Sequence, residues 1–357
     1  MLVREEKGKK IEEKSERATL FRSSLLQWYA ENGRDLPWRQ TQDPYKIWIS
    51  EIILQQTQVK QGLSYYLRFV ERFPTVRSLA EAPEEEVLHL WEGLGYYSRA
   101  HNMITAAGQV CNEKGGIFPS SYRELLSLKG VGAYTAAAIA SIAFGEAVAV
   151  VDGNVYRVLS RFNGIDTAID TTAGKKLFAE MAQEYIDKSE PALYNQAIMD
   201  FGALQCRPKG ALCSDCPIEH ECLARKADVV DLLPRKEKKV SVKEESIHYL
   251  LCFSKEGELI VRQRDKQGIW KALHELPTLS TEEIPSSKYE LLWQTSHQLT
   301  HRKLNIRIYT AQETLPDFSS PPFFSIPLHS HRSIAFPKPL REFLDSHFLL
   351  SSQTEPK

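Results

Sequence analysis

Four cysteines lie within a short stretch near the middle of the chain, and they constrain its fold more than any other feature. They are Cys206, Cys213, Cys216 and Cys222, with six, two and five residues between neighbours. Four thiolates in one loop suit an iron–sulfur cluster, which takes cysteine ligands from all sides. A structural zinc site is the main alternative, although its ligands usually form two close pairs and only one pair is close here. A disulfide framework is disfavoured, because nothing upstream looks secretory.

The length and charge of the chain narrow the class of protein further. With 357 residues the chain has room for about two domains, each with its own core. Its formal net charge is −1, so any basic surface that meets nucleic acid must be local. No apolar run approaches the roughly 18 residues that a membrane span requires. Residues 1–17 are rich in charges of both signs, and we expect them to form a disordered arm.

The periodicity of apolar residues changes near residue 240. Segments such as LFRSSLLQWYAEN and YTAAAIASIAFG place apolar side chains at helical intervals. The charged stretch VVDLLPRKEKKVSVKEES then reads as a linker, and IHYLLCF, ELIVRQR and LNIRIYT are typical of strands. The sequence therefore predicts a mainly α protein: a helical region over 18–227, a linker over 228–245 and a smaller α+β domain over 246–350.

A hairpin of two helices is predicted at about residues 119–144. The turn between its helices contains Gly130, Val131 and Gly132. Two glycines in a tight turn let backbone amides come close to a ligand, and the N-terminus of the following helix favours a phosphate. An ordinary turn between two helices is the alternative.

Two carboxylates have surroundings that suggest chemistry. Glu51 lies in KIWISEIILQQT, with Ile47, Trp48 and Leu54 at neighbouring helical positions. Burial on this apolar face would raise its pKa and keep a proton available near neutral pH. Otherwise, Glu51 would turn toward solvent. Asp152 follows the apolar run AVAVV and precedes NVYRVLSRF, so it could be a helix N-cap, a role that does not exclude catalysis.

These motifs together resemble a known family. The hairpin LKGVGAYTA, the stretch VDGNVYRVLSR and the cysteine spacing resemble the helix–hairpin–helix DNA glycosylases that carry an iron–sulfur cluster. Within that superfamily, LPWRQTQDPYKIWISEIILQQTQV and WEGLGYYSRAHNM closely resemble the adenine-specific mismatch glycosylases, the MutY family. The last hundred residues or so resemble that family's C-terminal domain, which is similar to a Nudix fold, through GIWKALHELP and HQLTHRKL.

The resemblance implies an activity and its requirements. The enzyme would hydrolyse the N-glycosidic bond of adenine mispaired with 8-oxoguanine or guanine, after flipping the base out of the duplex. Glu51 would be the general acid, and Asp152 would stabilise the oxocarbenium-like transition state. The four cysteines would hold one [4Fe-4S] cluster. The protein would act as a monomer on double-stranded DNA, without a membrane, in the cytoplasm and near the nucleoid if the source is bacterial.

The resemblance also implies roles for other residues. Tyr134 and Asn154 would assist catalysis. The adenine pocket and its surroundings would include Trp38, Arg39, Leu54, Thr57 and Gln196, and the residues that wedge into the base stack would be Gln56 and Tyr96. The hairpin residues Gly130, Val131 and Gly132 would meet the DNA backbone. Many members read the lesion with Phe-Ser-His in a C-terminal loop; here the matching residues are Leu299, Thr300 and His301.

Three other functions are alternatives to this one. A bifunctional glycosylase and lyase, similar to endonuclease III, would need a lysine where this chain has Tyr134, and a phenol cannot form a Schiff base. Nudix hydrolysis would need a glutamate-rich helix after GIWKALHELP, and no REx2EE arrangement follows it. A non-enzymatic DNA-binding protein with a cluster would not need a buried carboxylate at Glu51.

Overall fold

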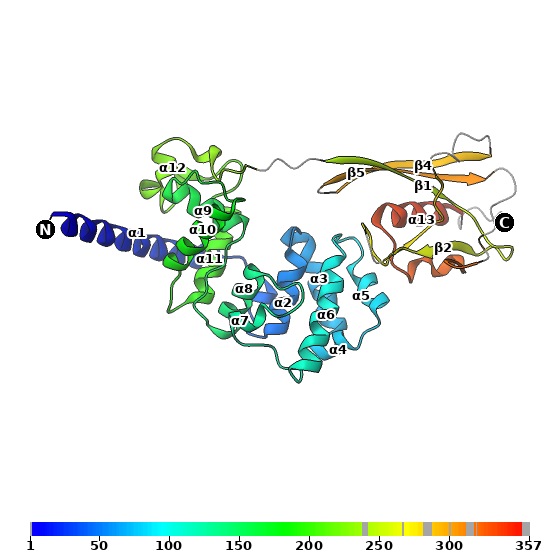
Figure 1. The fold of residues 1–357 in the computed structure, drawn as a ribbon, viewed down its shortest axis with the longest axis horizontal. Coiled ribbons are helices and arrows are strands. Elements are labelled where there is room, and N and C mark those ends of the chain that lie inside the picture. Colours follow the sequence, from blue (N-terminus) through cyan, green and yellow to red (C-terminus); the bar gives the residue numbers. More distant parts are fainter. Residues whose placement is uncertain are drawn as a thin grey trace. The chain divides into compact units, whose positions relative to one another are not determined.

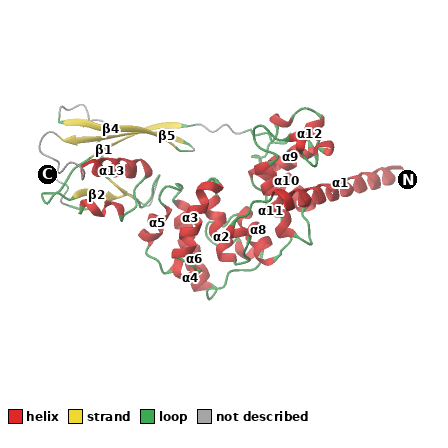
Figure 2. Cartoon of the chain, turned by 180° about the vertical axis from the view of Figure 1, so that it is seen from behind, coloured by secondary structure: helices red, strands yellow, loops and turns green. Residues whose placement is uncertain are grey.

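Helices and strands occupy different parts of the chain. The computed structural model describes residues 2–237, 242–265, 268–280, 288–299, 301–311, 318 and 320–351. Within these residues, the strands all lie at residue 243 or beyond, after a long series of helices (Figure 1, Figure 2). None of the described helices is both long enough and apolar enough to cross a bilayer. The predicted fold class, a helical region followed by a smaller α+β domain, is confirmed.

The helices have the following bounds. They are α1 (Leu2–Asn32), α2 (Pro44–Leu54), α3 (Val59–Arg72), α4 (Val76–Ala80), α5 (Glu84–Trp91), α6 (Ser98–Glu113), α7 (Tyr122–Leu125), α8 (Ala133–Phe144), α9 (Gly153–Asn163), α10 (Thr172–Tyr185), α11 (Pro191–Leu204), α12 (Leu223–Lys226) and α13 (Lys338–Ser351). Short 3-10 helices are η1 (Pro37–Arg39), η2 (Cys213–Asp215), η3 (Glu219–Glu221), η4 (Val230–Leu232) and η5 (Leu328–Arg332).

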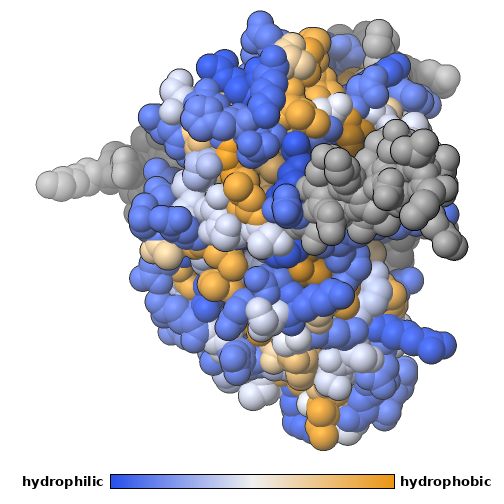
Figure 3. Space-filling view, turned by 90° about the vertical axis from the view of Figure 1, so that its left-hand side faces the viewer, coloured by the Kyte–Doolittle hydropathy of each residue, from blue (hydrophilic) through white to orange (hydrophobic). Residues whose placement is uncertain are grey.

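The chain groups into two compact units that do not follow the sequence order strictly. The first contains Met1–Val59, Phe73–Arg77 and Thr105–Lys239, and the second contains Lys60–Arg72, Ser78–Ile104 and Val240–Lys357. On the face shown in Figure 3, hydrophilic residues predominate and apolar residues form smaller patches between them. Such patches are normal, since apolar atoms supply much of any folded protein's surface.

Local signals set the helix boundaries where the sequence predicts them. Asp43 caps α2, because its carboxylate accepts the Tyr45 amide at 3.0 Å, and Pro44 occupies the first position of the helix. The expected disordered arm is wrong for the backbone, since α1 is continuous from Leu2. The sequence offers a reason: Glu5 and Lys9 stand four residues apart, as do Glu6 and Lys10, a spacing that stabilises helices.

The core of the first unit joins α1 to α9, α10 and α11. Phe21 of α1 is fully buried and packs against Phe162 at 4.7 Å and Tyr185 at 5.3 Å between ring centroids. Trp28 contacts Phe201 of α11 edge to face at 5.0 Å. Complete burial of side chains of this size contributes about 2 to 3 kcal/mol each. This core holds the helices that carry Asp152 and Gln196 in fixed positions.

Small residues let two further helices approach the site closely. The helix α8, AYTAAAIASIAF, is largely buried and packs against α2 and α11. In α11, a Cβ at Gly202 would stand 2.6 Å from the Cβ of Asn154, which no real side chain tolerates. Gly202 is therefore required for the close contact between α11 and α9.

The C-terminal residues form two small sheets with a helix. The strands are β1 (Lys243–Leu250), β2 (Leu259–Gln263), β3 (His274–Glu275), β4 (Tyr289–Gln298), β5 (Arg302–Ala311) and β6 (Phe323–Ile326). One sheet has the order β1-β5-β4, with β1 parallel and β4 antiparallel to β5, and the other has the order β3-β2-β6. Apolar residues of both sheets and of α13 share one buried core. The sequence predicted β1, β2 and β5 but missed β3, β4 and β6.

Candidate active site and cysteine loop

A cavity of about 580 Å³ opens among η1, α2, α8, α9 and α11. Its volume falls within the range of about 300 to 1,000 Å³ that is usual for small-molecule sites. Nine of the predicted site residues line it: Trp38, Arg39, Glu51, Leu54, Thr57, Tyr134, Asp152, Asn154 and Gln196. The fold thus gathers in one place residues that are spread over most of the helical region.

Glu51 is buried on α2 at the wall of this cavity. Glu51 is only 6% exposed, and Ile47 and Leu54 of the same helix line the cavity beside it. Burial raises the pKa of Glu51 from 4.5 to about 7, and the charge of Asp152 adds to this effect. A hydrogen bond from Tyr134 and the charge of Arg39 oppose it. The expected rise in pKa is confirmed, so the carboxyl group is partly protonated near neutral pH.

Tyr134 stands in the first turn of α8, beside Glu51. Its hydroxyl group is hydrogen-bonded to Glu51 and lies 3.2 Å from the sulfur of Met199. Burial, followed by the charges of Glu51 and Asp152, raises the pKa of Tyr134 well above 10. The phenol therefore stays neutral beside the Glu51 carboxyl group.

Asp152 caps α9, as its sequence position predicted. One carboxylate oxygen accepts the amides of Asn154 and Val155, both at 2.8 Å, and the other accepts the side-chain amide of Asn154 at 2.8 Å. Burial raises the pKa of Asp152 above 3.8 even though these three bonds lower it. The cap fixes the carboxylate at the cavity wall, where Asn154 also lies, so the capping role and a catalytic role are compatible.

Gln196, Trp38 and Leu54 supply the remaining wall with both polar and apolar surface. Trp38 in η1 is 6% exposed and Gln196 in α11 is 8% exposed. The amide oxygen of Gln196 accepts the hydroxyl group of Tyr29 at 3.2 Å, which fixes the orientation of the amide. The cavity thus combines apolar surface with fixed polar groups, as small-molecule sites do.

Gln56 and Tyr96, the two predicted wedge residues, lie outside the cavity wall and belong to different units. Both are exposed, Tyr96 by 44%. Both have backbones in the left-handed region, with φ of +58° for Gln56 and +48° for Tyr96. Such strain is uncommon outside glycine and often accompanies functional loops.

The predicted hairpin exists, with a short first helix. The helix α7 covers only Tyr122–Leu125, and α8 begins at Ala133 after Gly132. Gly130 requires its glycine because its φ is +77°, whereas Val131 is buried and anchors the turn. Gly130 and Gly132 are exposed, so the turn presents backbone to the outside.

Leu299 and His301, two of the three predicted lesion-reading residues, lie between β4 and β5. The amide of Leu299 donates to the carbonyl of Arg302 at 2.7 Å, which closes a tight hairpin. His301 is exposed, and its carbonyl accepts the amide of Lys243 at 3.0 Å. Thr300 lies outside the described residues. These residues belong to the second unit, and the cavity belongs to the first.

Sequence analysis missed four polar residues of this region: Arg34 and Arg157 line the cavity, and Tyr29 and Asp200 stand behind its wall. Asp200 is completely buried in α11 and binds Arg34 and Arg39, two arginines that line the cavity. Tyr29 lies below the guanidinium of Arg39, with 5.6 Å between them. Arg157 of α9 donates to the side chain of Asn154 at 2.8 Å and to the carbonyl of Cys206 at 2.7 Å. A buried aspartate in the apolar helix IMDFGAL was the one available signal.

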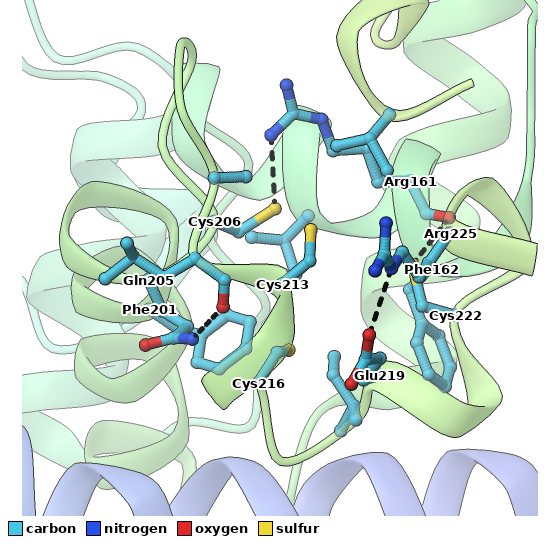
Figure 4. A pocket seen from close by; sticks show the side chains of 15 residues that line it. Arg161, Phe162, Phe201, Gln205, Cys206, Cys213, Cys216, Glu219, Cys222 and Arg225 are labelled. Carbon is cyan, nitrogen blue, oxygen red and sulfur yellow. Dashed lines mark hydrogen bonds and ion pairs between the residues drawn. The ribbon is translucent and has the colours of Figure 1, made fainter. Parts of the chain in front are cut away.

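The four cysteines line a second cavity in the first unit (Figure 4). They come from the loop after α11, with Cys213 in η2 and Cys222 directly after η3. Burial raises the pKa of the Cys216 thiol to about 12, and the charges of the other three cysteines add to this rise. A hydrogen bond to the backbone of Ile218 opposes it. Four thiolates in such a place need a cationic group to offset their charge.

The surroundings of the cysteines also suit a sulfur-ligated group. Arg161 is 2% exposed, and its guanidinium lies 3.4 Å from the sulfur of Cys206 and donates to the carbonyl of Arg207 at 2.7 Å. Hydrogen bonds to the ligating sulfurs are a usual feature of iron–sulfur sites. Within the described ranges, no three His, Cys, Asp or Glu side chains converge closely enough to hold a single metal ion. The donor set fits a cluster held by all four cysteines.

Comparisons with known proteins agree with the fold. Residues 49–184 match the HhH-GPD superfamily base excision DNA repair protein family, and residues 248–346 match the NUDIX domain. The solved structure of a thermostable thymine-DNA glycosylase is 30% identical with a TM-score of 0.56, covering 59% of this chain and 98% of its own. A non-covalent endonuclease III–DNA complex, at 23% identity and a TM-score of 0.51, shares the fold.

Relatives in sequence are more specific. The adenine DNA glycosylase of Homo sapiens is 46% identical over 216 residues, which are 58% of this chain and 40% of the human protein. The matched part of the chain thus spans less than half of each mammalian relative, namely 40% of the human protein and 42% of the mouse protein. The adenine DNA glycosylase of Buchnera aphidicola subsp. Baizongia pistaciae is 34% identical over 80% of this chain and 84% of its own length. The chain belongs to the adenine DNA glycosylase family.

Proposed function

We propose that this chain is a monofunctional DNA glycosylase that releases adenine mispaired with 8-oxoguanine or guanine. The observation that carries the proposal is that buried Glu51, whose pKa is raised to about 7, and the helix cap Asp152 line the same cavity. Cleavage of an N-glycosidic bond needs an acid for the leaving base and an anion beside the sugar, as in glycoside hydrolysis. Family membership supports adenine as the base.

The reaction would proceed by proton transfer and hydrolysis. Glu51 gives its proton to a ring nitrogen of adenine as the bond to C1′ breaks, and the bonding electrons leave with the base. The Asp152 carboxylate stabilises the positive charge that develops on the sugar. Water then adds to C1′, and its proton passes to a carboxylate, which leaves free adenine and an abasic site. Tyr134 holds the acid in position, and Asn154 holds Asp152.

The cavity walls would select adenine by shape and by hydrogen bonds. Trp38 and Leu54 offer apolar surface to the flat ring, and Gln196 offers an amide whose orientation Tyr29 fixes. Arg39 and Thr57 add donors at the wall. A site that hydrogen-bonds its ligand rejects bases that leave those groups unpaired, which can discriminate by several orders of magnitude.

DNA would be held by elements outside the cavity. The adenine must leave the base stack before it can enter, and the strained residues Gln56 and Tyr96 are proposed to fill the space in the duplex. The exposed turn at Gly130 and Gly132 would meet a phosphate. The β4–β5 turn with Leu299, Thr300 and His301 would read the 8-oxoguanine. We propose that one protein chain acts on each mispair.

A [4Fe-4S] cluster on Cys206, Cys213, Cys216 and Cys222 would brace the loop after α11. The cluster, when bound, supplies cross-links among the four thiolates. The loop also carries Arg207 and Lys209, both exposed, and Arg225 follows it, so a fixed loop would present positive charge to phosphates.

The proposal is tested with a labelled duplex that holds one adenine opposite 8-oxoguanine. The protein should create sites that break only after alkali, and borohydride should trap no covalent adduct, because Tyr134 replaces the lysine of a lyase. Strand breaks without alkali, together with efficient trapping, would favour the bifunctional alternative. Intact DNA after alkali would contradict the proposal itself.

The role of the C-terminal domain is tested on two duplexes. A truncated protein that ends at Lys238 should still excise adenine but should lose much of its preference for 8-oxoguanine over guanine as the opposite base. Replacing Thr300 and His301 together by alanine should reproduce much of that loss. An unchanged ratio of rates in both variants would assign lesion recognition to the helical region.

A further inference from the structure

A buried carboxylate behind the cavity pairs with two arginines of its wall. Asp200 of α11 is 0% exposed and does not itself line the cavity. One oxygen accepts Nε of Arg34 at 3.0 Å and Nη2 of Arg39 at 2.6 Å, and the other accepts the Arg34 amide at 3.0 Å. Both arginines line the same cavity as Glu51. Two cations and one anion leave this group with a net charge of +1.

These contacts fix part of the cavity wall. Arg34 precedes η1 and Arg39 is its last residue, so the shared carboxylate binds both ends of the segment that carries Trp38. The ring of Tyr29 lies 5.6 Å from the guanidinium of Arg39, and its hydroxyl group binds Gln196. Asp200 thereby supports, through Arg39 and Tyr29, groups on two separate stretches of chain.

The same carboxylate binds the cation that acts on Glu51, which is Arg39. The charged or titratable groups that face Glu51 are Tyr134 from α8, Asp152 from the start of α9 and Arg39 from η1. Arg39 is the one cation among them, and it favours ionised Glu51. Asp200 faces Arg34, Arg39 and Tyr29. Its carboxylate is hydrogen-bonded to Arg39 and partly offsets the charge of that cation.

We propose that Asp200 is a positioning residue that holds Arg34 and Arg39 at the cavity wall and balances their charge, so that Glu51 keeps its proton. This inference rests on the proposed function, in which Glu51 is the acid. An unbalanced Arg39 would stabilise the Glu51 carboxylate and would be free to turn toward it.

The test uses pH profiles of single-turnover adenine excision by the full-length protein. Because Glu51 must be protonated, the rate falls as the pH rises above its pKa. Asp200→Asn preserves the size of the side chain but leaves the two arginines with a charge of +2, so the alkaline limb of its pH–rate profile should move to lower pH. At a fixed pH on that limb, the rate should fall tenfold for each pH unit of displacement. Asp200→Glu should restore the limb at least in part.

Arg39→Met gives the opposite prediction, because it removes the cation nearest Glu51. Its alkaline limb should move to higher pH, even though the apparent affinity for the mispair falls. The double variant Asp200→Asn with Arg39→Met restores the net charge of +1 and should place the limb near that of the unmodified protein. This double variant keeps the inference testable if Asp200→Asn alone fails to fold.

Two outcomes would overturn the inference. One is a limb at an unchanged pH in every folded variant with uniformly lower rates, which would indicate a purely structural ion pair. The other is a shift of the same sign in Asp200→Asn and Arg39→Met. Failure of the proposed function is distinguishable, since the unmodified protein would then release no adenine at any pH.

Discussion

Replacing Glu51 by glutamine should make the protein more stable at alkaline pH while it destroys activity. Burial raises the pKa of Glu51 from 4.5 to about 7 in the folded protein. The folded state therefore holds a proton that the unfolded chain releases, and wild-type stability falls as the pH rises from 4.5 to 7. A gap of about 2.5 pH units at about 1.4 kcal/mol per unit corresponds to about 3 kcal/mol.

Glutamine cannot ionise, so Glu51→Gln escapes this loss. The difference in unfolding free energy, variant minus wild type, should be independent of pH below about 4.5 and should rise by about 3 kcal/mol by pH 8. Urea unfolding followed by tryptophan fluorescence at pH 4.5, 6 and 8 measures it. Asp152 titrates in both proteins, so its contribution largely cancels in the difference.

Glu113→Gln is the matched control, because Glu113 is exposed at the end of α6. It should change stability by less than about 0.5 kcal/mol at every pH. A flat difference for Glu51→Gln, equal to that of the control, would refute the argument that burial keeps Glu51 protonated.

Three further predictions follow from the site. Asp152→Asn should keep the α9 cap, because asparagine caps well, while excision measured in single turnovers falls by about 10²- to 10³-fold; activity within a few-fold of wild type would reduce Asp152 to a cap. Tyr134→Phe removes a hydrogen bond that lowers the pKa of Glu51, so the alkaline limb of the pH–rate profile should move to higher pH; a shift to lower pH would contradict this geometry. Cys213→Ser should lower the iron content and the visible absorbance of the purified protein, whereas a colourless wild type with one zinc would refute the cluster.

The sequence predicted the features that depend on local pattern. The pair Asp43 and Pro44 marks the start of α2, and the apolar positions around Glu51 indicate a buried acid. The glycines of the hairpin turn and the cap at Asp152 are also local signals. Each follows from residues within one or two helical turns, so one sequence suffices to find it.

The remainder depends on contacts between distant parts of the chain. Arg34 and Asp200 are 166 residues apart, and nothing near either residue indicates the other. The edge strand β4 was missed because none of its residues is buried, so its sequence lacks the apolar–polar alternation of a half-buried strand. The high charge content of residues 1–17 suggested a disordered arm, so the helical start of α1 was missed. The four-residue spacing of opposite charges is the signal that favours the helix.

In the proposed reaction, Glu51 protonates adenine, and water rather than a protein side chain adds to C1′ of the sugar. The most direct test is a single-turnover reaction in ¹⁸O-labelled water on a duplex with one adenine opposite 8-oxoguanine, with products identified by mass spectrometry. Wild-type protein should give free adenine and an intact strand whose abasic sugar carries one ¹⁸O atom, and Glu51→Gln should give neither above background. Free adenine from Glu51→Gln at the wild-type rate, or a sugar joined to the protein, would contradict the account.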